Sequence, residues 1–270
     1  MTNLSVTGVV HSLHYFEREF WLAYKTLESM MTTEDWNNTK MYLLKSKKID
    51  DKCFEHINRE EFEINKALLD AEWKKKNEES KATGTAVHEM IRNELATDIF
   101  AARRDFGLEG DVQSNDVFLM SDGGLFPEQR MEIPLDDEFQ LVGIADLISI
   151  KDGIVNIIDW KTDEDGIKFK SYYDVAKKHG KKLKYPMSKL DDINGVHYQL
   201  QLSIYMYMLL KLRPDLKPGK LKIVWLKDMK VRKVYEVEYL EKEVERLLAW
   251  YLKSTKLKIE TEKCRERKYE

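Results

Sequence analysis

The chain of 270 residues is long enough for one large domain or two small ones, and its 43% hydrophobic residues can supply a sizeable core. Its net charge of -3 excludes an argument for nucleic-acid binding from bulk charge, so such a partner requires a local basic patch. Its two cysteines lack a metal-ligand spacing, which argues against a disulfide framework and a zinc motif. It has no run of about 18 apolar residues, which argues against a membrane span. Together these features favour a cytoplasmic protein.

The first part of the chain is predicted to be mostly helical. A short β-branched run, SVTGVV, precedes an amphipathic helix, and residues 34–82 are highly charged and mostly helical. The charged residues form either a solvated helical face or an arm over a substrate channel. We therefore expect residues 1–83 to form an N-terminal helical region that packs on the core.

A further helical pattern contains His88. Its apolar stripe consists of Val87, Ile91, Leu95 and Ile99. His88 lies at the edge of this stripe. A lone helical histidine is usually structural, but an acid pair elsewhere in the chain would give it a function as a metal ligand.

Residues 141–162 carry the most informative pattern in the chain. Two apolar runs flank Asp152-Gly153, which predicts a two-residue hairpin with a type I′ turn, because that turn needs a positive φ at both central residues. This turn would place Lys151 opposite Ile154 and fix the pairing of the two strands.

The predicted register brings charged side chains together. It places Asp146 opposite Asp159, and these two residues share one face with Lys161 because side chains alternate along a strand. Burying two like charges side by side is costly unless a cation joins them. The three residues therefore predict a divalent metal and an activated water. Glu132, on the preceding strand, points either to this face or to solvent.

The segment after this hairpin is basic and aromatic. Lysines neutralise phosphates while aromatic rings stack on bases, so the segment is either a nucleic-acid contact or a flexible solvated loop. The candidate contacts are Lys168, Lys170, Lys177, Lys178, Lys181 and Lys182.

The remaining pattern completes an α/β fold. A buried helix follows, on which Gln201 and Tyr205 are four residues apart and share a face. Two strands, a helix and a charged tail over residues 256–270 come next. We expect a central mixed β-sheet of four or five strands flanked by helices, in a core spanning residues 84–255. The chain has no phosphate-binding glycine loop, which argues against an NTP-driven motor.

Four motifs follow one another along the chain: GTAVH at 84–88, GIAD at 143–146, DWK at 159–161 and QLSIY at 201–205. Their order resembles the RecB-like branch of the PD-(D/E)xK nuclease superfamily. The flanking stretches SVTGVV and EWKKKNEESKATGTAVH resemble phage-encoded exonucleases and the mitochondrial genome maintenance exonuclease. The CRISPR-associated relatives carry four cysteines for an iron–sulfur cluster. Cys53 and Cys264 cannot supply four ligands, so no such cluster is expected.

The resemblance implies a metal site. Asp146 and Asp159 would bind Mg²⁺ or Mn²⁺, with the backbone carbonyl of Trp160 as a further ligand. His88 would complete a second or shared site, and its imidazole suits Mn²⁺ better than Mg²⁺.

The resemblance also implies catalytic roles. Beside the two aspartates, Lys161 would position and help deprotonate the attacking water and counter the charge of the transition state. Gln201 and Tyr205 would orient that lysine or the DNA backbone.

The expected function is that of a metal-dependent exonuclease on single-stranded or frayed DNA ends. Replication, recombination or phage DNA processing in a bacterial or phage-infected cell would be its setting, with proteins of those pathways as further partners. The alternatives are a structure-specific endonuclease and a nucleic-acid-binding subunit that has the fold but does not cleave.

Overall fold

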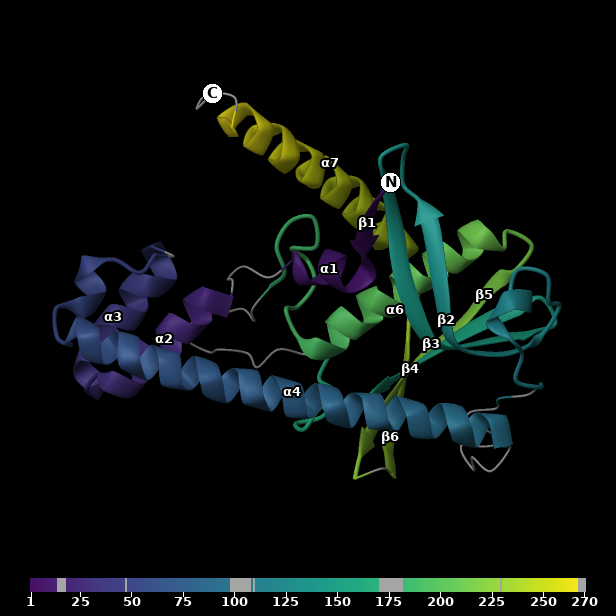
Figure 1. Cartoon of the computed structure of the whole chain (residues 1–270), viewed down its shortest axis with the longest axis horizontal. Helices are drawn as coiled ribbons and strands as arrows, with labels where there is room; N and C mark the ends of the chain where they lie inside the picture. The colour runs from purple at the N-terminus through teal and green to yellow at the C-terminus, as the bar shows by residue number, and fades with distance from the viewer. Residues whose placement is uncertain are drawn as a thin grey trace. The chain divides into compact units, whose positions relative to one another are not determined.

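The computed structural model describes two compact units, whose elements are labelled in Figure 1. The helical unit comprises His14–Thr83, and the sheet unit comprises Met1–Leu13 and Gly84–Glu270. The first thirteen residues thus group with the sheet, whereas we had assigned them to the helical region. The described residues are 1–13, 18–46, 48–97, 108, 110–169, 182–228 and 230–266.

The helical unit has its own small core, in which Leu27, Leu43 and Phe62 are buried. Its elements are α2 (Arg18–Met30), α3 (Thr33–Ser46), the 3-10 helix η1 (Asp51–Phe54) and the first part of α4 (Arg59–Thr97). Asn58 caps α4, because its Oδ1 accepts hydrogen bonds from the backbone N–H groups of the second and third residues of that helix. The two helical patterns expected on either side of Gly84 belong to this one helix.

The sheet unit is built on a mixed sheet of six strands, one more than the most we expected. The strands are β1 (Thr2–Ser5), β2 (Gly124–Pro134), β3 (Phe139–Lys151), β4 (Ile154–Lys161), β5 (Lys217–Lys227) and β6 (Lys230–Val237). The pairs β1/β3 and β4/β5 are parallel, and β2/β3, β3/β4 and β5/β6 are antiparallel. The predicted α/β class with a mixed central sheet is confirmed.

The predicted β3–β4 hairpin has the expected turn and register. Asp152 and Gly153 both have positive φ, at 52° and 71°, as a type I′ turn requires. Lys151 pairs with Ile154, and the pairing continues to Leu147 opposite Ile158.

One side of β3 is only partly paired. Strand β2 runs along the other side from Gln140 to Ile150, so β1 and β4 must share the remaining side. There β1 pairs up to Val142, and β4 pairs from Leu147 onward. Residues 143–146 of β3 therefore lie between the last residue paired with β1 and the first residue paired with β4. We call this stretch the gap, and it holds the GIAD motif.

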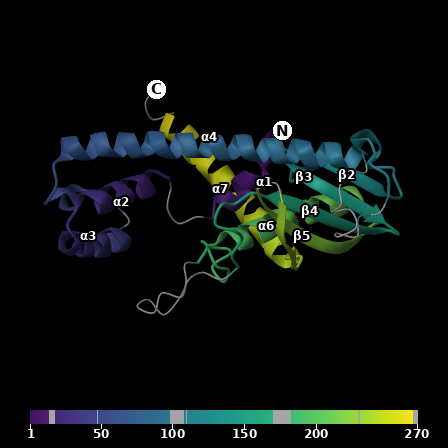
Figure 2. The same ribbon diagram turned by 90° about the horizontal axis from the view of Figure 1, so that it is seen from below.

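Helices cover both faces of the sheet (Figure 2). Helix α6 (Asn194–Leu212) packs on the face that carries Ile148 and Ile157, in the largest core. The end of α4 packs on the opposite face, where Val87 and Ile91 contact a cluster that includes Trp160. The candidate site therefore lies within reach of both helices.

Helices lie near both ends of the chain. SVTGVV is mostly helix α1 (Val6–His11), because the Ser5 side chain accepts a hydrogen bond from the Gly8 N–H and starts the helix. Helix α7 (Glu241–Glu266) extends through most of the expected charged tail. A further 3-10 helix, η2, spans Asn115–Val117. None of the helices within the described ranges is long and apolar enough to cross a membrane.

Candidate active site

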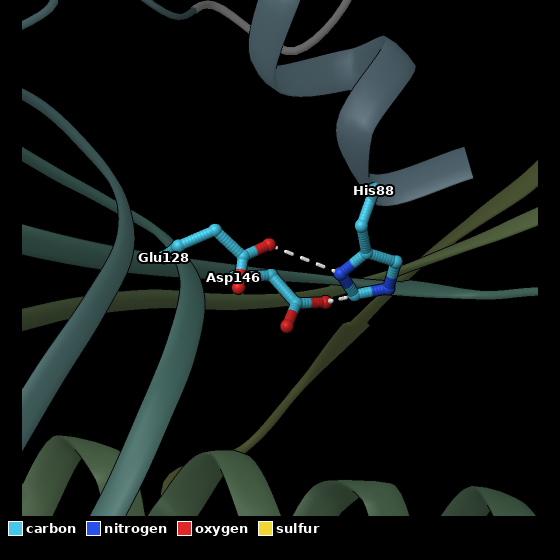
Figure 3. A group of neighbouring side chains, drawn as sticks. All are labelled: His88, Glu128 and Asp146. Carbon is cyan, nitrogen blue, oxygen red and sulfur yellow. Dashed lines mark hydrogen bonds and ion pairs between the residues drawn. The ribbon is translucent and has the colours of Figure 1, made fainter. Parts of the chain in front are cut away.

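Three potential metal ligands come from three elements of the sheet unit (Figure 3). His88 lies on α4, Glu128 on β2 and Asp146 on β3, and their ligand atoms all lie within 4.8 Å of one another. The Nδ1 atom of His88 is 3.1 Å from Oε1 of Glu128, and its Nε2 atom is 3.6 Å from Oδ2 of Asp146. Two carboxylates with one imidazole suit a divalent cation such as Mn²⁺.

Glu128 was not found by the sequence analysis. The β2–β3 pairing on either side of it places Glu128 directly opposite Asp146. Glu132, which we had considered instead, is exposed and forms an ion pair with Arg130 at 2.5 Å. The signal that could have located Glu128 is the short acidic turn at residues 136–138, because the turn of a hairpin fixes its register.

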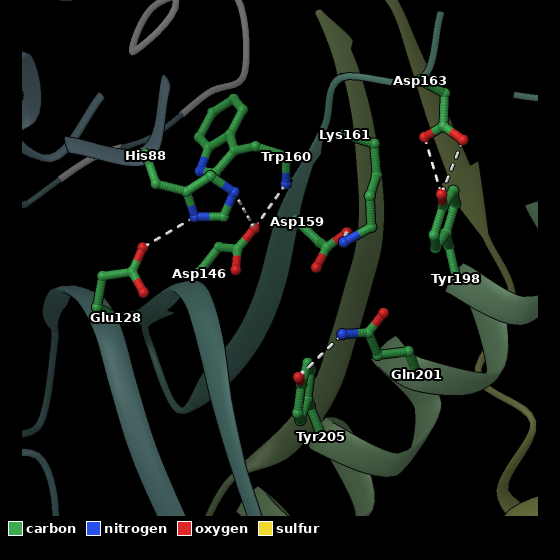
Figure 4. Close-up of polar contacts among 10 residues, drawn as sticks. All are labelled: His88, Glu128, Asp146, Asp159, Trp160, Lys161, Asp163, Tyr198, Gln201 and Tyr205. Carbon is green, nitrogen blue, oxygen red and sulfur yellow. Dashed lines mark hydrogen bonds and ion pairs between the residues drawn. The ribbon is translucent and has the colours of Figure 1, made fainter. Parts of the chain in front are cut away.

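Asp159 and Lys161 form a buried ion pair beside this group (Figure 4). The Nζ atom of Lys161 is 2.6 Å from Oδ2 of Asp159, whose residue is 1% exposed. Oδ1 of Asp159 is buried without a hydrogen-bond partner in the described part of the chain. A buried carboxylate oxygen is normally satisfied, so this atom lacks a partner that a bound cation would supply.

Asp146 connects the two strands that diverge at the gap. Its Oδ2 accepts a hydrogen bond of 2.8 Å from the backbone N–H of Trp160. The carboxylate thereby takes over the role of a ladder hydrogen bond where β3 and β4 no longer pair. This bond also fixes the backbone of Trp160 next to the acidic group.

The electrostatics of the group favour a bound cation. Burial, together with the charge of Asp159, raises the pKa of Asp146 to about 7. A hydrogen bond to Glu128 and the charge of Asp146 raise the pKa of His88 despite its burial. Burial alone would lower the pKa of Lys161, but Asp159 and Asp146 outweigh it and raise the pKa. The protein thus holds more negative charge here than its own cations neutralise.

Lys161 is enclosed by residues that sequence reasoning missed. Its Nζ lies 4.8 Å from the centre of the Tyr198 ring. The hydroxyl of Tyr198 is 2.9 and 2.8 Å from the two carboxylate oxygens of Asp163, and Asn194 Nδ2 donates to the same carboxylate. The available signal was spacing, because Tyr198 lies about one helical turn before Gln201.

Gln201 and Tyr205 lie together on α6, as their spacing predicts. Gln201 Nε2 donates to the Tyr205 hydroxyl at 3.0 Å. Burial raises the pKa of Tyr205, so this hydroxyl stays protonated. A Cβ at Gly143 would lie 2.6 Å from the Tyr205 ring and 2.8 Å from Val6, so glycine is needed where the gap meets α6.

Comparison with known proteins identifies the family. The sequence model of the PD-(D/E)XK nuclease superfamily matches residues 47–270. The chain belongs to this superfamily. Membership indicates a metal-dependent nuclease, and the His88, Glu128 and Asp146 group is a potential metal site for it. The substrate class is therefore a nucleic acid.

Other comparisons add little. A search of curated proteins gave no match. Among solved structures, the crystal structure of SSO0001 matches with 15% sequence identity and a TM-score of 0.32, over 86% of this chain and 83% of that one. A similarity this low carries no argument about this nuclease.

The predicted basic contacts are only partly described. Lys168 is exposed, and its backbone N–H is held by Asn194. Lys182 forms an ion pair with Asp191 at 2.5 Å, which reduces the charge it can offer a phosphate. Lys170, Lys177, Lys178 and Lys181 lie outside the described residues, so their contribution stays a prediction.

A hollow of about 350 Å³ lies next to the potential metal ligands. Thr85, His88, Glu89, Arg92 and Glu128 line it. The imidazole and one carboxylate of the ligand group therefore open onto this hollow.

Proposed function

We propose that this nuclease is a Mg²⁺- or Mn²⁺-dependent deoxyribonuclease of the RecB-like branch, acting as an exonuclease on single-stranded or frayed DNA ends. The observation that carries the proposal is the unpartnered Oδ1 of Asp159 beside the ion pair with Lys161. The carboxylate of Asp146 lies next to this pair and has a pKa raised to about 7. The RecB-like assignment and the exonuclease activity rest on the order of the four sequence motifs.

The residues fit a divalent cation. His88, Glu128 and Asp146 would hold it, and Asp159 would add the oxygen that has no hydrogen-bond partner. The backbone carbonyl of Trp160 remains a further proposed ligand. A bound cation would polarise the scissile phosphate and activate a water molecule.

Lys161 would orient the attacking water. Because Asp159 and Asp146 raise its pKa, the side chain is an ammonium at neutral pH. It therefore donates hydrogen bonds and stabilises the negative charge that develops on the phosphate oxygens. The face of Tyr198 and the Asp159 carboxylate hold the ammonium in place, so its position is set before the substrate binds.

Gln201 and Tyr205 would act together, with Gln201 nearer to the substrate. Tyr205 is 4% exposed, so it serves Gln201 rather than DNA. Held by the Tyr205 hydroxyl, the amide of Gln201 would orient Lys161 or a backbone phosphate.

Cleavage of labelled DNA tests the proposal. Wild type, Asp159→Ala and Lys161→Ala are incubated with Mg²⁺, with Mn²⁺ or with EDTA. We expect cleavage that requires metal and falls at least about 10²-fold in each variant, the lower end of the range for loss of one group that stabilises the charge of the transition state. Asp165→Ala is the matched control, because Asp165 is an exposed carboxylate in the loop after β4. Undiminished cleavage by both site variants would refute the assignment.

Substrate topology tests the mode of cleavage. An exonuclease leaves circular single-stranded DNA intact and degrades the linear form, whereas an endonuclease cuts both. RNA of the same sequence, run in parallel, tests the choice of DNA. Binding to DNA without cleavage of any form would favour a non-cleaving subunit. Replication, recombination or phage DNA processing in the cytoplasm is the setting we propose.

A further inference from the structure

The β5–β6 hairpin carries a concentration of positive charge that the site does not use. Within residues 227–233, the four cations Lys227, Lys230, Arg232 and Lys233 accompany a single acid, Asp228, which forms an ion pair with Arg232 at 2.9 Å and leaves three cations in excess. All four side chains belong to exposed residues. The whole chain, in contrast, has a net charge of -3. We call these four residues the basic hairpin.

The arrangement of these charges is unfavourable for the hairpin itself. Lys227 and Lys230 pair directly across the turn, where like charges repel. Lysines on an edge strand can prevent association between sheets, but that purpose does not require them to be at one end. Farther along β6 the sign changes at Glu236, which forms an ion pair with Lys220 at 3.0 Å. The positive charge is therefore concentrated at the turn.

The turn lies at the end of the sheet that carries the candidate site. Strands β4 and β5 are parallel, and Lys161 pairs with Trp225. Lys227 follows Trp225 by two residues, which is about 7 Å along a strand. Its Nζ lies 3.3 Å from the carbonyl oxygen of Glu164, in the loop that leaves the site. Figure 1 shows the β6 hairpin extending beyond the neighbouring strands.

We propose that the basic hairpin binds the phosphate backbone of a nucleic acid whose cleaved end lies at Asp159 and Lys161. The substrate class rests on the proposed function. Ammonium groups attract phosphates as point charges and read no bases, so this contact adds affinity without sequence preference. Such a contact would hold the strand in register while its end reacts.

The test compares two variants that lose the same charge. Lys230→Gln/Lys233→Gln removes two charges from the basic hairpin. Lys217→Gln/Lys220→Gln removes two charges from the opposite end of the same strand pair. Binding of a fluorescently labelled single-stranded DNA is followed by anisotropy over a series of salt concentrations in EDTA, so that no metal-dependent cleavage interferes. Circular dichroism confirms that each variant is folded.

The hairpin variant should bind more weakly and depend less on salt. Each lost phosphate contact on single-stranded DNA lowers the slope of log K against log salt by about 0.7, so we expect a decrease of about 1.4. The control should keep the wild-type slope. Equal slopes for both variants, or wild-type protein that does not bind DNA, would overturn the proposal. Binding that depends on the hairpin without any Asp159-dependent cleavage would support the contact between the hairpin and the phosphate backbone, while refuting the nuclease proposal and the position of a cleaved end at Asp159.

Discussion

Replacing Asp146 with asparagine should make the metal-free protein more stable while removing its activity. The carboxylate is 11% exposed and shares its surroundings with Asp159, and it has a pKa of about 7 in place of its ordinary 3.8. A carboxyl group whose pKa is raised by folding binds its proton more tightly in the folded state. It therefore destabilises the fold progressively as the pH rises from about 4 to above 7.

The size of this penalty follows from the pKa. Each pKa unit corresponds to about 1.4 kcal/mol, so the rise to about 7 costs about 4 kcal/mol at pH 8. Asparagine removes this cost and keeps an oxygen for the Trp160 N–H, although hydrogen bonds to a charged acceptor contribute about 1.5–3 kcal/mol and are weakened. We expect a net gain of about 2 kcal/mol at pH 8 and none near pH 4.

Thermal unfolding in EDTA at both pH values measures this difference. A gain of about 2 kcal/mol corresponds to a rise in Tm of about 4–8 °C for a unit of this size. Adding Mn²⁺ at 100 times its Kd should stabilise wild type by about 2.7 kcal/mol and Asp146→Asn much less. The reasoning is wrong if Asp146→Asn is less stable than wild type at pH 8 in EDTA, or if metal stabilises both proteins equally.

Three other substitutions test separate parts of the site. Glu128→Gln should lower Mn²⁺ affinity at least tenfold in calorimetry, because it removes one of two grouped carboxylates; unchanged affinity would exclude Glu128 as a ligand. Gly143→Ala should lower stability by about 1–3 kcal/mol in thermal unfolding, since its Cβ would meet Tyr205 at 2.6 Å; a wild-type Tm would show that the ring can move. Tyr198→Phe keeps the ring but loses the contact with Asp163, so it should reduce kcat less than Tyr198→Leu, which loses both. Equal kcat values in the two variants would contradict a role for the ring.

The fold was largely predictable where local chemistry decides it. Asp152-Gly153 specifies one turn type, and that turn fixes the β3–β4 register without information from the rest of the chain. The β-branched run SVTGVV carried no prediction of a helix, because β-branched residues favour strands, whereas Ser5 supplies a cap that starts one. Gly84 did not divide α4, because a single glycine costs a long helix only about 1 kcal/mol.

The candidate site was less predictable because it depends on long-range pairing. The acids of one hairpin could be placed by counting from its turn, but Glu128 needed the register of a second hairpin. Asp163 and Tyr198 are 35 residues apart and meet only because α6 packs on the sheet. The spacing of Tyr198 and Gln201 places both on one side of α6, but it does not show that the Tyr198 ring faces Lys161.

The number of residues between Asp146 and Asp159 is a functional constraint, because both carboxylates lie just beyond the paired part of the β3–β4 hairpin, at the gap in the sheet. Five cross-strand pairs separate these residues from the turn, so each strand contributes an arm of five residues between the turn and its aspartate. One extra residue in either arm would turn every side chain beyond it to the opposite face and remove a carboxylate from the site. Extra residues in the turn would leave both arms unchanged. Evolution could therefore lengthen this protein at Asp152-Gly153, whereas the arms must keep their count.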